Sequence, residues 1–207
     1  MPVRVAIEEG KRRVFAAALD WPGWCRSART EAEALEVLAA YRARYAPVPR
    51  LARVRFVGPD VAFEVIERGP GTATTDFGAP DVVAGADRAP TDRAEARRLR
   101  ALVAASWTVL EDVVAGAPPV LRRGPRGGGR DRDPIVHHVE KAERAYGAKL
   151  GIRRPADVVA LRAAVLERLG TPSDGVPVVE RGWPPRYAAR RIAWHALDHA
   201  WEIEDKS

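Results

Sequence analysis

The chain contains four histidines, and their spacing is the feature most able to support chemistry: His137, His138, His195 and His199. The last two are four residues apart, which places them one turn apart on the same face of a helix. Two neutral imidazoles in that arrangement can hold one divalent metal ion. Ala196 stands where the zinc helix of metalloproteases needs a glutamate, so the motif excludes a protease of that type.

The adjacent pair is separated by its helical phase. At about 100° per residue, His138 lies at the edge of the face that carries Ile135 and Val139, whereas His137 points to the far side. Histidines that bind nothing are the ordinary alternative, but three buried imidazoles without a partner would be costly. Three imidazoles around a metal with one open position are a familiar catalytic arrangement. We therefore predict that His138, His195 and His199 bind one divalent ion, zinc or nickel.

Amphipathic helices are expected to position these ligands. Capping residues, a proline in a first turn and apolar residues at helical spacing predict four of them. Their approximate ranges are 92–113, 133–150, 155–169 and 184–205. Helices of this length with short to medium connections favour a four-helix bundle over residues 91–207.

The N-terminal third has a different, mixed periodicity. Alternating apolar residues predict strands, and Thr30 with Glu33 forms a capping box for a helix. The predicted order is strand, strand, helix, strand, strand, with the strands at 3–7, 14–19, 54–57 and 61–66. Residues 67–90 are rich in Gly, Pro, Thr and Asp and are expected to form a linker. The fold class is therefore α+β, with an α/β domain at residues 1–66 followed by the bundle.

The last predicted helix also carries an apolar stripe opposite its histidines. Trp194, Leu197 and Trp201 fall within about 60° of one another. A solvent-facing stripe with two tryptophans is unusual. We expect the N-terminal domain or a second chain to cover it, which leaves a homodimer open.

Both regions carry motifs of known families. The segment Ala18–Trp24, followed by Thr30–Leu35, resembles the HicB-like small α/β fold over about the first sixty residues. That resemblance implies a fold and a surface for a protein partner, but not antitoxin activity, since no DNA-binding motif accompanies it. The segments Ile135–Glu143 and Ala193–Glu202 resemble the DinB-like bundle superfamily over residues 91–207. This resemblance implies His138, His195 and His199 as metal ligands.

The DinB-like superfamily includes thiol-dependent enzymes such as the mycothiol-dependent maleylpyruvate isomerase. The resemblance implies a metal-dependent S-transferase or hydrolase that acts on a small electrophile, with a low-molecular-weight thiol as a further cofactor. Asp198 and Glu202 flank the ligands and are candidate proton carriers, and Glu143 is a third acidic candidate. The arginines of residues 121–130 are candidates for recruiting a carboxylate. The alternative is a non-catalytic binding module stabilised by the metal, with the HicB-like domain contacting a protein partner.

Composition bears on the kind of partner, on the location of the protein and on the presence of disulfides. The net charge is +6, but 30 of the 34 basic residues are scattered arginines, which does not favour a nucleic-acid site. No apolar run of about 18 residues is present, so no membrane span is expected. The N-terminus lacks the pattern of a signal peptide, which makes the cytoplasm the expected location. Cys25 is the only cysteine, so an internal disulfide is impossible.

Overall fold

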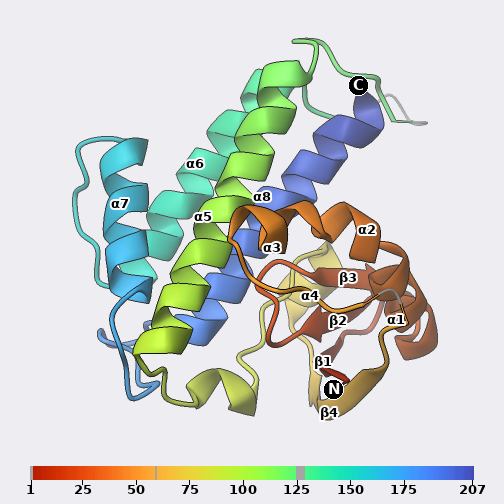
Figure 1. The fold of residues 1–207 in the computed structure, drawn as a ribbon. Helices are drawn as coiled ribbons and strands as arrows, with labels where there is room; N and C mark the ends of the chain where they lie inside the picture. Colours follow the sequence, from red (N-terminus) through yellow and green to blue (C-terminus); the bar gives the residue numbers. More distant parts are fainter. Residues whose placement is uncertain (1, 59, 125–128) are drawn as a thin grey trace.

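The computed structural model describes residues 2–58, 60–124 and 129–207 and has an α+β fold (Figure 1). Its four-stranded sheet has the order β3-β2-β1-β4. Strand β1 runs antiparallel to β2 and parallel to β4, and β2 runs antiparallel to β3. The strands are β1 (Val3–Glu9), β2 (Val14–Ala18), β3 (Cys25–Ala28) and β4 (Phe63–Pro70).

Helix α1 (Glu31–Ala40) covers one face of the sheet. It begins at the predicted capping box, in which Thr30 and Glu33 bind each other's backbone N–H groups. Its buried residues Ala34 and Leu38 join the core that the apolar residues of β1 and β2 form. The short helices α2 (Arg42–Tyr45) and α3 (Pro47–Leu51) follow, and α3 reaches α5.

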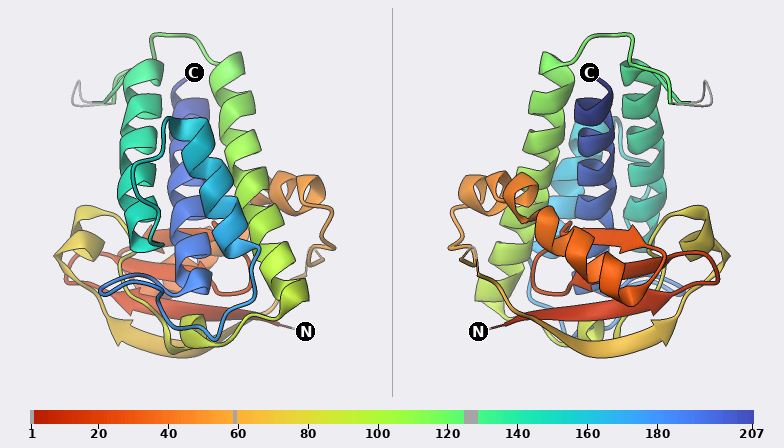
Figure 2. Two further views of the ribbon diagram at one scale, coloured as in Figure 1. Left: turned by 90° about the vertical axis from the view of Figure 1, so that its left-hand side faces the viewer. Right: turned by 90° about the vertical axis from the view of Figure 1, so that its right-hand side faces the viewer.

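The four predicted helices are present: α5 (Arg93–Gly116), α6 (Arg132–Lys149), α7 (Val158–Leu169) and α8 (Pro185–Lys206). Figure 2 shows them side by side, with the sheet crossing the lower part of the bundle and α1 on the far side of the sheet. Helix α8 contacts α5, α6 and α7 and is buried over most of its length. None of the helices in the described ranges combines the length and apolar character that a membrane span needs.

Residues of the N-terminal region cover the apolar stripe of α8, one of the two covers that were predicted for it. The Trp194 ring meets the edge of Phe15 on β2, with ring centroids 6.1 Å apart. The Trp201 ring meets Tyr41, with centroids 5.0 Å apart. Both tryptophans and Leu197 are buried. Strand β2 is consequently buried along its whole length, because it lies between α1 and α8.

The predicted strand order is wrong in two places. Residues 54–57 are not a strand, because β4 occupies the free edge of β1. The guanidinium of Arg42 instead binds the carbonyl groups of Val57 and Gly58. Strand β3, at residues 25–28, was not predicted; it is only four residues long and includes the polar Arg26 and Ser27.

The predicted linker at residues 67–90 is also wrong, because this segment is folded onto the sheet. It contains the end of β4, the helix α4 (Ala73–Phe77) and the 3₁₀-helix η1 (Gly85–Arg88). The buried carboxylate of Glu8 on β1 accepts hydrogen bonds from the backbone N–H groups of Asp81 and Val82. Backbone donors of a loop are thus satisfied by a strand side chain. One continuous apolar core includes residues of both the sheet and the bundle, so no core boundary falls at residues 66–67.

Candidate metal centre

Helices α6 and α8 bring three of the four histidines together. His138, His195 and His199 each present a ring nitrogen within 4.8 Å of the other two. Their ring centroids are 4.7 to 5.2 Å apart. His195 and His199 share one face of α8 because they are one turn apart, and α6 supplies His138 from the neighbouring helix.

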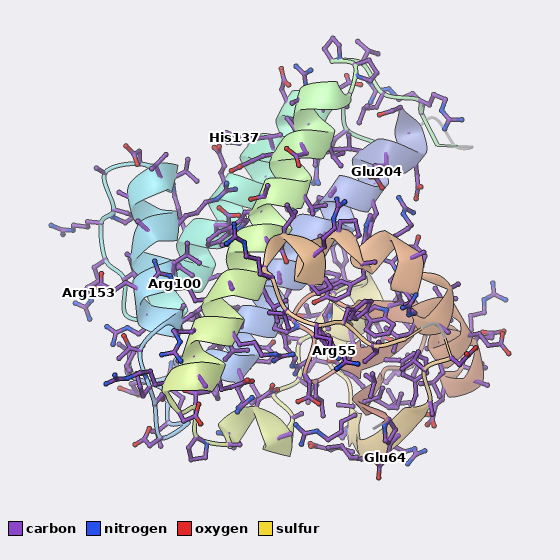
Figure 3. The ribbon with its side chains drawn as sticks, viewed as in Figure 1. Arg55, Glu64, Arg100, His137, Arg153 and Glu204 are labelled. Atoms are coloured by element: carbon purple, nitrogen blue, oxygen red, sulfur yellow. The ribbon has the colours of Figure 1, made fainter. Side chains whose placement is uncertain are left out.

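The phase argument for the adjacent histidine pair is confirmed. His137 is exposed, and Figure 3 shows it on the outer side of α6. His138 is half-buried, while its neighbours Ile135 and Val139 lie in the core. A one-residue difference on the same helix therefore separates a cluster member from a surface residue.

The surroundings of His195 and His138 favour the neutral form of these two imidazoles. His195 is only 6% exposed, and its burial, followed by the proximity of His199, Arg191 and His138, lowers its pKa from 6.5 to about 2. Burial is likewise the largest cause of the lowered pKa of His138, followed by the influence of His199. A metal ligand must be deprotonated, so a neutral imidazole is the form that can bind an ion.

Glu202 orients His199. Its Oε2 lies 2.8 Å from Nδ1 of His199, so a hydrogen on that nitrogen is donated to the carboxylate and Nε2 stays free as a lone-pair donor. This hydrogen bond is the largest cause that lowers the pKa of Glu202, to about 2, and Lys206 binds the other carboxylate oxygen. Glu202 was a candidate proton carrier, but its contacts instead match the carboxylate that fixes a metal-ligating histidine.

Asp198 is held elsewhere. Its Oδ1 accepts a hydrogen bond of 2.7 Å from Nη1 of Arg26 on β3. The same guanidinium lies over the Tyr41 ring, 4.1 Å from its centroid. Asp198 therefore forms an ion pair that links α8 to the sheet. Because this carboxylate is engaged by Arg26, we assign it a structural role and not that of a proton carrier.

The residues present fit a divalent ion. Nδ1 of His195 is buried and has no hydrogen-bond partner among the described residues, which is a costly state for an imidazole. Nitrogens that share one tetrahedral zinc ion at about 2.1 Å lie about 3.4 Å apart, and the three nitrogens here lie within 4.8 Å of one another before any ion is bound. Three imidazoles without a carboxylate suit zinc or nickel better than magnesium or calcium, which prefer oxygen ligands.

The other candidates lie apart from this cluster. Glu143 is buried and accepts hydrogen bonds from Arg162 of α7, 2.9 Å from Nε. Burial raises the pKa of Glu143, against the opposing effect of that arginine. In the arginine-rich segment 121–130, Arg123 pairs with Asp131, and Arg126 lies outside the described residues.

Two residues near His195 were missed by sequence reasoning. The Tyr146 ring meets His195, with centroids 5.6 Å apart, and the guanidinium of Arg191 lies over Tyr146, 5.2 Å from its centroid. Arg191 precedes His195 by four residues, as His195 precedes His199. The spacing rule that paired the two histidines would also have placed Arg191 on their face.

Comparisons with known proteins found no relative that indicates the function of this protein. The sequence matches no protein-family model, and no curated protein or solved structure is significantly similar to it. The HicB-like resemblance of residues 1–66 and the DinB-like resemblance of residues 91–207 thus rest on their motifs alone. What the structure does show is an α+β fold in which three histidines are close enough to hold one metal ion.

Proposed function

We propose that this protein is a metal-dependent enzyme, an S-transferase that uses a low-molecular-weight thiol or a hydrolase, and that it acts on a small electrophile. The observation that carries the proposal is the convergence of His138, His195 and His199, with a buried and unpartnered nitrogen on His195. Bound there, a divalent ion lowers the pKa of a thiol or a water molecule and so supplies a nucleophile near neutral pH.

The residues of the chain would prepare the site for that chemistry. The low pKa of His195 keeps its imidazole neutral and available as a ligand. Glu202 holds His199 in the tautomer that leaves Nε2 free. The rings of Tyr146 and Trp194 pack beside His195 and exclude water from one side of it. Three neutral ligands leave the charge of the ion uncompensated, which favours an anionic fourth ligand such as a thiolate.

Metal analysis of the purified protein tests the site directly. We expect one divalent ion per chain, zinc or nickel. The substitutions His195→Ala and His199→Ala should each abolish stoichiometric metal, because each removes one of three ligands. His137→Ala is the matched control, since this neighbour of His138 is exposed, and it should retain the metal. Equal loss from His137→Ala would contradict the assignment of the ligands.

Cobalt substitution then tests the chemistry. A thiolate that binds cobalt adds a charge-transfer absorption band, which water does not, so mycothiol-like or bacillithiol-like thiols should change the spectrum. If none does, the transferase version fails and the hydrolase version remains. A cobalt ion saturated by protein ligands would contradict both versions and favour a binding module stabilised by metal.

A further inference from the structure

Arg191 on α8 carries a buried charge with no acidic partner. Arg191 is only 8% exposed, and its Nε and Nη1 atoms are buried without a hydrogen-bond partner among the described residues. No carboxylate oxygen of the described residues forms a salt bridge with it. Burying a guanidinium without a counter-charge is costly, and natural proteins normally pair such a group.

The neighbouring arginine shows the usual solution. Arg190 is equally buried, but it donates to both carboxylate oxygens of Asp87 on η1. The fold therefore supplies a counter-ion for one of two adjacent arginines and leaves the other without one. The difference points to a partner for Arg191 that comes from outside the chain.

The surroundings of Arg191 offer donors to that partner. Its guanidinium lies over the Trp194 ring, 4.7 Å from the centroid. The indole Nε1 of Trp194 and the hydroxyl of Tyr187 are also buried without a hydrogen-bond partner. These three side chains line one small cavity of about 10 Å³, which is enough for about one water-sized group and so matches a single carboxylate oxygen. A positive charge beside an N–H and an O–H donor is the environment that a carboxylate needs.

This group of donors lies beside the candidate metal centre. Arg191 precedes His195 by one helical turn, a rise of about 5.4–6 Å along α8. Both residues contact the rings of Tyr146 and Trp194. None of the three histidines lines the cavity itself, so a molecule held at both places would pass along the shared rings of Tyr146 and Trp194.

We propose that Arg191, with the indole N–H of Trp194 and the hydroxyl of Tyr187, binds the carboxylate of a small molecule that reacts at the metal. This inference rests on the proposed function for the role of that molecule, but the carboxylate site can be tested separately. The carboxylate belongs either to the thiol or to the electrophile, and the two sources need separate probes.

The first experiment uses the cobalt-loaded full-length protein. For the thiol, the dissociation constants of 3-mercaptopropionate and 3-mercapto-1-propanol are compared from the cobalt absorption spectrum. For the electrophile, succinate and succinamide are compared as competitors of 3-mercapto-1-propanol. The wild-type protein should bind the carboxylate of at least one pair about tenfold more tightly than its neutral counterpart, and the pair that shows the preference identifies the source.

Variants assign the preference to Arg191. Arg191→Met should reduce the ratio to about 1 while the metal content and the affinity for 3-mercapto-1-propanol stay unchanged. Arg191→Lys keeps the charge and should retain part of the preference. Arg186→Met is the matched control for the loss of one positive charge on α8, since Arg186 pairs with Glu95, and it should keep the full ratio. A ratio near 1 in the wild type, or an unchanged ratio in Arg191→Met, would overturn the proposal.

A second readout needs no metal. Propionate added to the metal-free protein should shift the indole N–H resonance of Trp194, assigned with Trp194→Phe, in a saturable manner. Propionamide should not shift it, and Arg191→Met should abolish the shift. If the wild-type protein binds no metal, the proposed function fails, while this resonance still decides the carboxylate site. Equal shifts with propionate and propionamide, or tighter binding of inorganic phosphate, would refute the site even if the metal is present.

Discussion

At the scale of single residues, the hydrogen bond between Glu202 and His199 is the contact that organises the candidate metal centre. It selects the tautomer of one ligand and holds its ring in place. Lys206 in turn binds Glu202, so three residues of the last two turns of α8 form one hydrogen-bonded chain. Cys25, by contrast, is buried, and burial raises the pKa of its thiol to about 12. It is therefore a packing residue and not a nucleophile.

Removal of the Glu202 carboxylate should weaken metal binding. Glu202→Ala leaves His199 without its acceptor, so we expect an affinity for zinc about 10- to 100-fold lower, measured by competition with a chelating dye. Glu204→Ala is the control, because Glu204, labelled near the C-terminal end of α8 in Figure 3, pairs with Arg44 and not with a histidine. Similar losses in both variants would mean that the charge of the helix end, and not the contact with His199, sets the affinity.

At the scale of elements, α8 combines two functions on opposite faces. One face carries His195 and His199, and the opposite face carries Trp201, which meets Tyr41. Arg191 lies over the Trp194 ring at the boundary between these two faces. The turn between β2 and β3 approaches this second face closely. Gly23 in that turn has a φ of 94°, and a Cβ placed on it would lie 2.6 Å from Cδ1 of Leu197. Only glycine satisfies both the backbone conformation and the contact.

Gly23→Ala should therefore destabilise the protein. A side chain at a positive φ costs about 1–2 kcal/mol, and the clash with Leu197 adds to it, so we expect a free energy of unfolding about 2–4 kcal/mol lower. Urea denaturation followed by circular dichroism measures the change. Gly116→Ala at the end of α5 meets no atom within 4 Å and should be close to neutral. A Gly23→Ala variant as stable as the wild type would show that the turn is not packed against α8 as described.

At the scale of the whole molecule, the N-terminal half and the bundle depend on each other. Phe15 on the sheet and Tyr41 at the end of α1 cover the two tryptophans of α8, and Asp87 in the segment before α5 neutralises the buried Arg190. Removal of one partner from such a buried pair costs about 3–5 kcal/mol. The bundle therefore lacks both an apolar cover and a counter-ion when it is separated from residues 1–90.

A fragment of residues 91–207 should accordingly be less soluble than the full chain and should expose its tryptophans to water. The exposure of Trp194 and Trp201 should shift its tryptophan fluorescence to the red and lower its solubility, since a large apolar patch promotes association. Fluorescence spectroscopy and analytical size-exclusion chromatography measure the two effects. An unchanged spectrum from a monodisperse fragment would argue against the shared core.

Local sequence patterns were sufficient to predict the four long helices and the candidate metal ligands. The 3.6-residue period is a local property, so the phases of His137 and His138 and the one-turn spacing of His195 and His199 could be calculated without a structure. The capping box of Thr30 and Glu33 is local in the same way. The burial of the tryptophan stripe also followed from the sequence, although the choice between the N-terminal domain and a second chain did not.

The contacts between groups that are distant in the chain could not be predicted in this way, because they depend on how the whole chain folds. The pairing of β4 with β1, the docking of residues 67–90 on Glu8 and the ion pair of Asp198 with Arg26 all join segments far apart in the chain. Arg190 and Arg191 are indistinguishable as neighbours in the sequence, yet one has Asp87 as its counter-ion and the other has none. Helical periodicity predicts which face of a helix a residue occupies. The free-energy cost of a buried charge, however, depends on the groups packed against that face, and these come from distant parts of the chain that only folding brings together.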